Sequence, residues 1–219
     1  MKGKHLALII TGIILADQAL KFYIKLHYTY QEHHAIIGTD NVVPNFSLLF
    51  IENEGMAWGW KFGGDLGKIV LTLFRLAAVI WGVFILRDFI EKKYHKGFII
   101  CAGMIFAGAL GNLIDSMFYG MIFENSSQCF PTVAHLFPKG GGYAGFLHGK
   151  VVDMLYFPLI KIDNLPSWIP FIGGSEFTFF DPVFNIADAS ISVGVMIMLA
   201  FQNIFFKKAK DTDSIQAKI

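Results

Sequence analysis

Cysteine and charge are both scarce in this chain of 219 residues. The two cysteines are Cys101, in an apolar run, and Cys129, in a polar loop, which excludes a disulfide framework or a cysteine metal cluster. Charged residues make up only 16%, whereas soluble domains carry about a quarter. The formal net charge of +1 gives no reason to expect a nucleic acid as a partner. Hydrophobic residues reach 54% and the mean hydropathy is +0.53, a composition typical of an integral membrane protein.

Several catalytic motifs are also missing. The histidines are scattered and do not have the spacing of a zinc site such as HExxH. There is no Gly-x-Ser-x-Gly elbow and no phosphate-binding loop. A serine, zinc or nucleotide mechanism therefore has little support.

Long apolar runs are what the chain does contain. A helix needs about 20 residues to cross a bilayer. The segments that are apolar enough lie at about 5–25, 67–87, 97–118 and 183–206. Lysines precede the first of them, as in a signal peptide, but no small-x-small cleavage site follows, so we interpret it as an uncleaved span. The sequence thus predicts a mainly α-helical polytopic membrane protein with four spans and a single domain over residues 1–219.

Lysine and arginine predict the orientation of these spans. Four spans place both termini on one side, and that side carries most of the basic residues, such as Lys92, Lys93, Lys207 and Lys208. The loops on the opposite side, 26–66 and 119–182, carry few of them. The positive-inside rule therefore places both termini in the cytoplasm and both long loops outside.

The two outer loops have the patterns of ordered structure. Residues 45–60, NFSLLFIENEGMAWGW, mix aromatic and aliphatic residues in short runs that favour β-strands, and then break at Gly55 and Gly59. In the second loop, KVVDMLYF also predicts a strand. Tryptophans in both loops suit a structure that lies at the level of the lipid headgroups.

Two matched polar pairs interrupt the last two apolar runs. Asn112 and Asp115 lie three residues apart, as do Asn185 and Asp188, so each pair shares one face of its helix. Because the third span runs outward and the fourth runs inward, both pairs fall near the outer end of the bundle. Helix capping would explain either pair alone. The two pairs at one depth, together with Asp153 in the apolar VVDML between them, instead indicate a functional site.

Two other charged positions in the apolar runs are less informative. Asp17 precedes Lys21 by one helical turn, so an ion pair within the helix can offset the cost of burial, and we favour a structural role. Arg75 in the second run is ambiguous, because it can face the bundle interior or pair with a carboxylate.

Carboxylates at a membrane surface are compatible with two kinds of protein. Two aspartates that share a site cannot both ionise cheaply, so one can activate water while the other, protonated, hydrogen-bonds a carbonyl and protonates the leaving amine. That is aspartyl peptide hydrolysis. A small proton-coupled membrane carrier or a membrane assembly factor could use the same residues, and the residues alone place the protease only modestly ahead.

The motifs nevertheless resemble one family throughout the chain. ADQALK (16–21), NEGMAWG (53–59), GALGNLIDS (108–116), GKVVDML (149–155) and FNIADASISVG (184–194) are similar to those of lipoprotein signal peptidase, the type II signal peptidase of bacteria. The resemblance implies a four-helix aspartyl endopeptidase of the inner membrane with a small β-cradle on its outer face. It also implies removal of signal peptides from lipid-modified prolipoproteins, just before the lipidated cysteine, beside membrane lipids and without a cofactor. We expect a monomer.

The resemblance also assigns roles to residues. It makes Asp153 and Asp188 the catalytic pair, and the residues expected to bind substrate or support the pair are Asn53, Gly55, Gly108, Asn112, Asp115 and Asn185. Ser116 stands where the family usually has arginine, which puts in doubt whichever contact that arginine makes. The stretch 119–148 is longer than the family's usual linker, and a lid over the site is one hypothesis for it.

Overall fold

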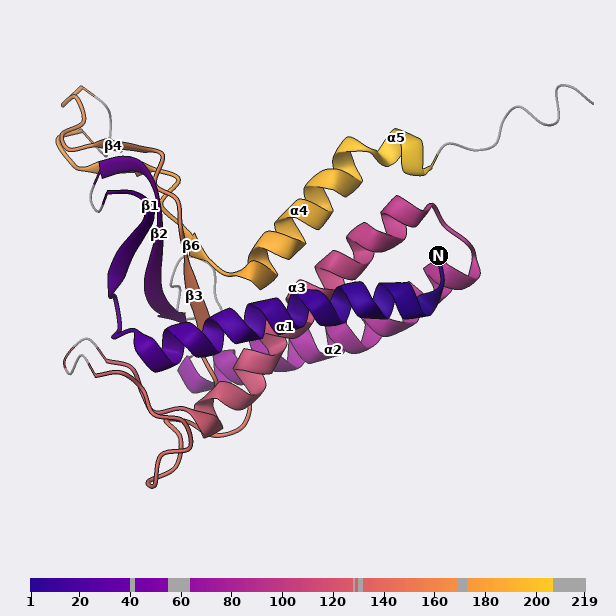
Figure 1. The fold of residues 1–219 in the computed structure, drawn as a ribbon, viewed down its shortest axis with the longest axis horizontal. Helices are drawn as coiled ribbons and strands as arrows, with labels where there is room; N and C mark the ends of the chain where they lie inside the picture. The colour runs from indigo at the N-terminus through magenta and orange to yellow at the C-terminus, as the bar shows by residue number, and fades with distance from the viewer. Residues whose placement is uncertain (40–41, 55–63, 128, 130–131, 169–172, 207–219) are drawn as a thin grey trace, which may run out of the picture.

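The chain was analysed as a computed structural model, which describes residues 1–39, 42–54, 64–127, 129, 132–168 and 173–206. Helices lie side by side toward one end of the molecule, and most strands gather at the other end (Figure 1). The bundle consists of α1 (Gly3–His27), α2 (Gly64–Glu91), α3 (Lys96–Ile122) and α4 (Ile186–Ala200), followed by the short α5 (Gln202–Phe205). The first three coincide within a few residues with the first three predicted spans.

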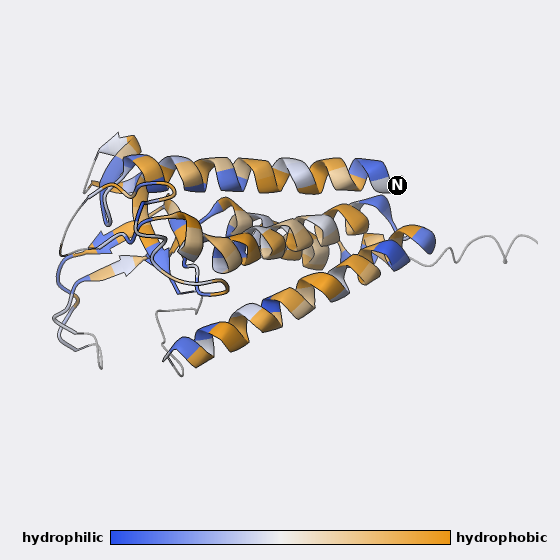
Figure 2. Ribbon diagram, turned by 90° about the horizontal axis from the view of Figure 1, so that it is seen from below, coloured by the Kyte–Doolittle hydropathy of each residue, from blue (hydrophilic) through white to orange (hydrophobic). Residues whose placement is uncertain are grey.

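Among the residues that the structure describes, three helices, α1, α2 and α3, are long and apolar enough to cross a membrane. Helix α2 presents large apolar side chains such as Phe74, Trp81 and Phe84 on its exposed surface, as a lipid-facing helix does. Figure 2 shows hydrophobic residues along the helices and hydrophilic ones concentrated at the sheet end. The fold is therefore that of a mostly helical membrane protein with a small sheet.

The fourth predicted span differs from the structure in its bounds. Residues Val183–Phe184 form a short strand, and α4 covers only Ile186–Ala200 before the chain turns at Phe201 into α5. The physical reason lies at Asn185, whose side-chain oxygen accepts a hydrogen bond from the backbone N–H of Asp188 and so fixes the start of the helix. At this length α4 does not by itself confirm a fourth crossing.

Helix α3 is the centre of the bundle and packs against α1, α2 and α4. Small residues bring α3 and α4 together: a Cβ atom on Gly108 would lie 2.2 Å from the carbonyl oxygen of Ala187 and 2.6 Å from Ile191 Cγ1. Only glycine allows this approach of two backbones. The first turn of α4 is thus held directly against α3.

The larger sheet has the strand order β1-β2-β3-β6 and is antiparallel throughout. Its strands are β1 (His33–Thr39), β2 (Val42–Asn53), β3 (Val151–Tyr156) and β6 (Val183–Phe184). Strands β2 and β3 confirm the strands predicted in the two loops. A separate hairpin of β4 (Ile160–Ile162) and β5 (Phe177–Phe179) was not predicted.

One hydrophobic core joins the sheet to the helices. It consists of Ile24, Phe50, Tyr119, Phe123, Val152 and Met154, which come from α1, β2, the end of α3 and β3. Strand β3 is buried from Val151 to Met154, which explains its nearly continuous apolar sequence. This core fixes the position of β3 relative to the outer turns of α1 and α3.

The long stretch between α3 and β3 is fastened to the last turns of α3. The backbone N–H groups of Tyr143, Ala144, Leu147 and Gly149 donate to carbonyl oxygens of residues 116–123. A Cβ on Gly149 would lie 2.0 Å from the carbonyl oxygen of Asp115, so glycine is needed for this approach. Residues 119–122 belong to α3 itself. The described part of this segment therefore ends directly beside Asp115, where β3 begins.

Candidate active site

Asp153 lies in the middle of β3, opposite Ile51 of β2, and only 4% of it is exposed. Asn185 donates a hydrogen bond from Nδ2 to Asp153 Oδ1 at 2.7 Å, and the side chain of Asn53 also hydrogen-bonds this carboxyl group. Burial raises the pKa of Asp153 to about 8, and the nearby charge of Asp188 adds to the rise. Lys21 and the two asparagine hydrogen bonds act in the opposite direction. The group therefore holds its proton at neutral pH.

Asp188 lies in the first turn of α4 and is half-buried. Asn112 of α3 donates from Nδ2 to Asp188 Oδ1 at 2.7 Å. The backbone N–H of Asp188 donates to Asn185 Oδ1 at 2.8 Å, so the residue that caps the helix also holds this aspartate in place. The carboxyl group of Asp188 is thus held by a residue within α3, and its backbone by the residue that caps α4.

Asn185 and Asn112 connect the two aspartates. Asn185 Nδ2 lies 2.7 Å from Asp153 Oδ1 and 3.2 Å from Asn112 Oδ1, while Asn112 contacts Asp188. The two amides thus form a continuous polar path from β3 to α4. Asn185 therefore caps α4 and also supports the polar site. The sequence had offered helix capping and a functional site as alternatives, and for Asn185 the two are compatible.

Lys21 of α1 contacts one of these amides, that of Asn112, and is completely buried. Its Nζ lies 2.8 Å from Asp17 Oδ2, 2.7 Å from Asp115 Oδ2 and 2.9 Å from Asn112 Oδ1. The ion pair with Asp17 was predicted, but the one with Asp115 of α3 was not. An ammonium group has three donors, and these contacts use all three. Lys21 therefore orients Asn112 and neutralises carboxylates beside it.

Asp115 is fully buried and does not reproduce the surroundings of Asp188. Gln18 Nε2 donates to Asp115 Oδ1 at 2.8 Å, and the backbone N–H of Val152 lies 3.4 Å from Asp115 Oδ2. Asp17 in turn accepts a hydrogen bond from the backbone N–H of Ala187 at 2.9 Å. These two buried carboxylates attach β3 and α4, the elements that carry Asp153 and Asp188, to α1 and α3.

Arg75 of α2 approaches the same region from another side. Its Nη1 donates to Ser116 Oγ at 3.1 Å, and Ser116 Oγ donates to the carbonyl oxygen of Asn112 at 2.9 Å. The arginine interacts electrostatically with Asp188, Asp115 and Asp153. Of the two alternatives left open by the sequence, the structure bears out the first: Arg75 faces the bundle interior, where it interacts electrostatically with these carboxylates.

Two of the predicted site residues are glycines, Gly108 and Gly55. Gly108 lies where α3 meets Ala187, so its visible contribution is to helix packing. Gly55 lies outside the described residues. Within the part of the chain that the structure describes, no group of three or more histidine, cysteine, aspartate or glutamate side chains could hold a metal ion.

A second polar network was not predicted. Lys25, at the end of α1, is completely buried; it forms an ion pair with Glu52 of β2 and donates to Ser126 Oγ at 2.7 Å. Lys150 Nζ lies 3.2 Å from the other Glu52 oxygen. The available signal was Lys25 itself, a charge one turn after Lys21, but nothing in the sequence identifies its distant partner.

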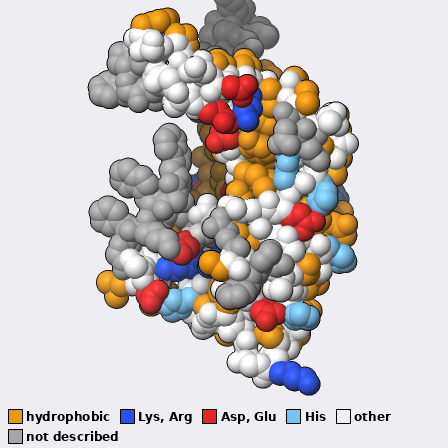
Figure 3. Space-filling model, turned by 90° about the vertical axis from the view of Figure 1, so that its left-hand side faces the viewer, with side chains coloured by type: hydrophobic (Ala, Val, Ile, Leu, Met, Phe, Trp, Pro, Cys, Tyr) orange, Lys and Arg blue, Asp and Glu red, His pale blue; other side chains and the backbone are white. Residues whose placement is uncertain are grey.

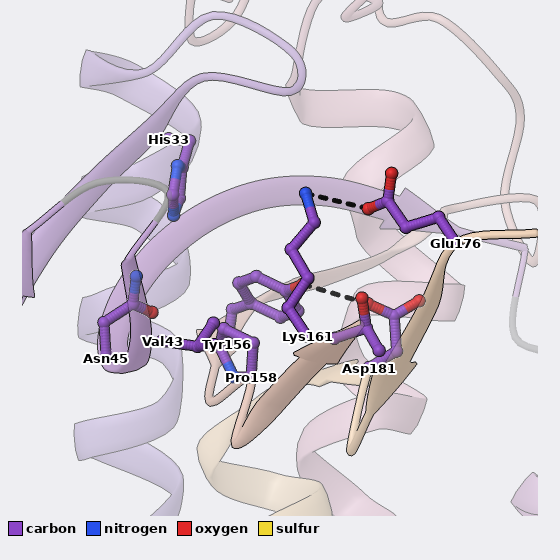
Figure 4. Close-up of a pocket in the computed structure, with 9 residues that line it drawn as sticks. His33, Val43, Asn45, Tyr156, Pro158, Lys161, Glu176 and Asp181 are labelled. Atoms are coloured by element: carbon purple, nitrogen blue, oxygen red, sulfur yellow. Dashed lines mark hydrogen bonds and ion pairs between the residues drawn. The ribbon is translucent and has the colours of Figure 1, made fainter. Parts of the chain in front are cut away.

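The sheet end also carries a pocket of about 310 Å³ that is separate from the two aspartates. His33, Asn45, Tyr156, Lys161, Glu176 and Asp181 are among the residues that line it (Figure 4). Tyr156 donates to Asp181 Oδ1 at 2.9 Å, and Lys161 forms an ion pair with Glu176 at 2.8 Å. Figure 3 views this end, where acidic, basic and histidine side chains are scattered among hydrophobic ones. The pocket does not include Asp153 or Asp188.

Fold and site together define a helical membrane protein in which two aspartates are held at the junction between the helices and a small sheet. A solved bacterial membrane enzyme has the same fold, with a TM-score of 0.56 over 95% of this chain and 94% of that chain, at 21% identity. A second solved structure of a bacterial membrane enzyme gives a TM-score of 0.53 over 96% of both chains.

Sequence comparison identifies the family. The model of the signal peptidase (SPase) II family matches residues 9–205. The lipoprotein signal peptidase of Porphyromonas gingivalis is 43% identical over 90% of this chain and 82% of its own length, and that of Amoebophilus asiaticus is 31% identical over 86% and 75%. The chain therefore belongs to the signal peptidase II family. It is a protease, and membership supports the cleavage of lipoprotein signal peptides.

Proposed function

We propose that the chain is an intramembrane aspartyl endopeptidase whose catalytic pair is Asp153 and Asp188. Its substrates would be lipid-modified prolipoproteins, cut just before the lipidated cysteine. One observation carries the proposal: Asn185 contacts Asp153 through its amide nitrogen and the backbone of Asp188 through its amide oxygen. A single side chain thus holds the carboxyl group of Asp153 and the backbone that carries Asp188.

The two aspartates have different surroundings, which assigns them different tasks. Because its pKa is raised to about 8, Asp153 carries the proton at neutral pH and hydrogen-bonds the carbonyl oxygen of the scissile peptide. Asp188 takes a proton from water, and the resulting nucleophile attacks the carbonyl carbon. Asp153 then protonates the leaving amine. No cofactor takes part in these steps.

The neighbouring residues act as supports in this proposal. Asn53 and Asn185 orient Asp153, and Asn112 orients Asp188. Asp115, through Lys21, holds Asn112 in the orientation that donates to Asp188. Gly108 brings α4 close enough to α3 for these contacts.

We further propose four crossings of the inner membrane in one domain, with both termini in the cytoplasm and the sheet outside. Helix α4 has 15 residues, about 23 Å at 1.5 Å per residue, and the short α5 continues the chain beyond the turn at Phe201. α5 lies toward the same end of the bundle as the N-terminus (Figure 1). The substrate would then reach the aspartates laterally from the outer leaflet, and the chain would work as a monomer among membrane lipids.

The test is a gel-shift assay with purified protein and one lipidated precursor. Asp153→Asn and Asp188→Asn should each abolish cleavage, because neither amide can exchange the proton that the reaction needs. Asp163→Asn is the matched control, since Asp163 is an exposed carboxylate in the same segment of the chain. Near-normal cleavage by either dyad variant would refute the assignment, and a wild-type chain that leaves the precursor uncut would favour a carrier.

A further inference from the structure

Arg75 is a charged side chain in an apolar helix, and its position needs an explanation. It lies in α2, where its neighbours along the exposed surface are large apolar residues such as Phe74. A charged side chain inside the bilayer is unfavourable in free energy unless it faces polar partners inside the bundle. Arg75 meets this condition, because its Nη1 donates to Ser116 Oγ at 3.1 Å.

Ser116 is built to receive this guanidinium. Its hydroxyl group donates its one proton to the carbonyl oxygen of Asn112 at 2.9 Å, which leaves the lone pairs of the oxygen for Arg75. Ser116 is only 1% exposed, so this hydroxyl is fixed in a closed environment. The contact thus holds the arginine one residue away from Asp115 and within the electrostatic range of Asp188.

The balance of charges around Asp188 gives Arg75 a specific task. The charged groups of this polar cluster come from Asp17 and Lys21 of α1, Arg75 of α2, Asp115 of α3 and Asp153 of β3, of which Arg75 and Asp153 interact electrostatically with Asp188. Lys21 forms ion pairs with Asp17 and Asp115 and donates a hydrogen bond to the amide oxygen of Asn112. Arg75 is the second cation of the group, and among its carboxylate neighbours it interacts most strongly with Asp188.

We infer that Arg75 is a positioning residue for catalysis: held by Ser116, its positive charge acts on Asp188 and supports that carboxylate in its role as the base. The inference rests on the proposed dyad and deepens it. A guanidinium is well suited to this position because it keeps its charge at every working pH. Without it, the cation left in the cluster would be Lys21, which is already paired with Asp17 and Asp115.

The test is the pH dependence of precursor cleavage in Arg75→Gln and Arg75→Lys. A neighbouring charge shifts a carboxyl titration by about one unit or more, so the acidic limb of the Arg75→Gln profile should move to higher pH by about that amount. Cleavage at the acidic end would fall about tenfold, with less loss near neutral pH. Arg75→Lys keeps the charge and should leave the limb nearly in place.

A purely structural role of Arg75 predicts a different pH profile. If the arginine only fastened α2 to α3, Arg75→Gln would lower the rate by one factor at every pH and leave the limb unmoved, which would overturn the inference. Ser116→Ala provides the same test in a chain that keeps Arg75, and should move the limb in the same direction by a smaller amount. An unmoved limb in Ser116→Ala would likewise count against it.

A final experiment moves the arginine from position 75 to position 116. The Ser116 oxygen touches the guanidinium, so an arginine at position 116 can reach the same region from α3. The double variant Arg75→Gln with Ser116→Arg should return the acidic limb toward its wild-type position. Inactive Asp153→Asn and Asp188→Asn with unmoved limbs would refute only the role of Arg75. Active dyad variants would refute the proposed function itself.

Discussion

At the scale of single residues, one asparagine has three functions. Asn185 caps α4, donates to Asp153 and contacts Asn112. The local part of this role was visible in the sequence, because an asparagine before an apolar helical run predicts a cap. The contact with Asp153 was not visible, because 32 residues separate the two along the chain.

The raised pKa of Asp153 has a direct consequence for activity. A raised pKa means that the carboxyl group keeps its proton up to about pH 8 and loses it above. Because the proposed mechanism needs Asp153 protonated, the cleavage rate should fall about tenfold for each pH unit above that value. The pH–rate profile of the purified protein measures this limb. A rate that keeps rising beyond pH 9 would contradict the assignment of Asp153 as the acid.

At the scale of elements, α3 and α4 depend on a close approach that glycine permits. Their contact occurs at Gly108, against the carbonyl oxygen of Ala187, one turn from the residues that hold Asp188. A pattern of small residues on an apolar helix predicts some helix contact. It does not identify the partner helix or the depth of the contact.

The approach can be tested with Gly108→Ala. The added Cβ would lie 2.2 Å from a backbone oxygen, so α4 must move away and carry Asp188 with it. Such overpacking lowers the free energy of unfolding by about 1–3 kcal/mol. Because Asp188 is displaced as well, the rate of cleavage should fall more than this loss of folded protein alone would cause. Gly12→Ala on α1 is the control, since no atom lies within 4 Å of its added Cβ. Equal thermal stability and cleavage in both variants would contradict this packing role.

At the scale of the whole molecule, buried ion pairs join the helices to the sheet. Lys25 of α1 and Glu52 of β2 are 0% and 2% exposed, and Lys150, just before β3, also contacts Glu52. This network lies beside the hydrophobic core formed by Ile24, Phe50 and Val152. The sheet is therefore attached to the bundle by both apolar and ionic contacts, which hold β3, the strand that carries Asp153, against α1 and α3.

Removal of Glu52 should destabilise the protein strongly. Glu52→Gln leaves the buried ammonium of Lys25 without its carboxylate, and an uncompensated buried charge costs about 3–5 kcal/mol. The melting temperature of the purified protein in detergent measures the effect. Glu176→Gln removes an exposed partner of Lys161 and should change the melting temperature little. Similar melting temperatures for the two variants would show that the network contributes nothing.

The sequence by itself determined three of the helices, two of the strands and the residue types of the site. These features follow from local patterns: apolar runs long enough to span a bilayer, short β-favouring runs, and polar residues on one helix face. The end of α4 at Ala200, the β4–β5 hairpin and the Lys25–Glu52 network were not determined in this way.

Only the tertiary structure decided how the charges are shared. Lys21 was expected to pair with Asp17, one turn away, but it also joins Asp115, and Arg75 reaches Ser116 from another helix. The reason is physical: buried charges need partners in space, and those partners come from helices and strands that are distant along the chain. Local periodicity places a carboxylate on a face, and packing alone decides which cation meets it.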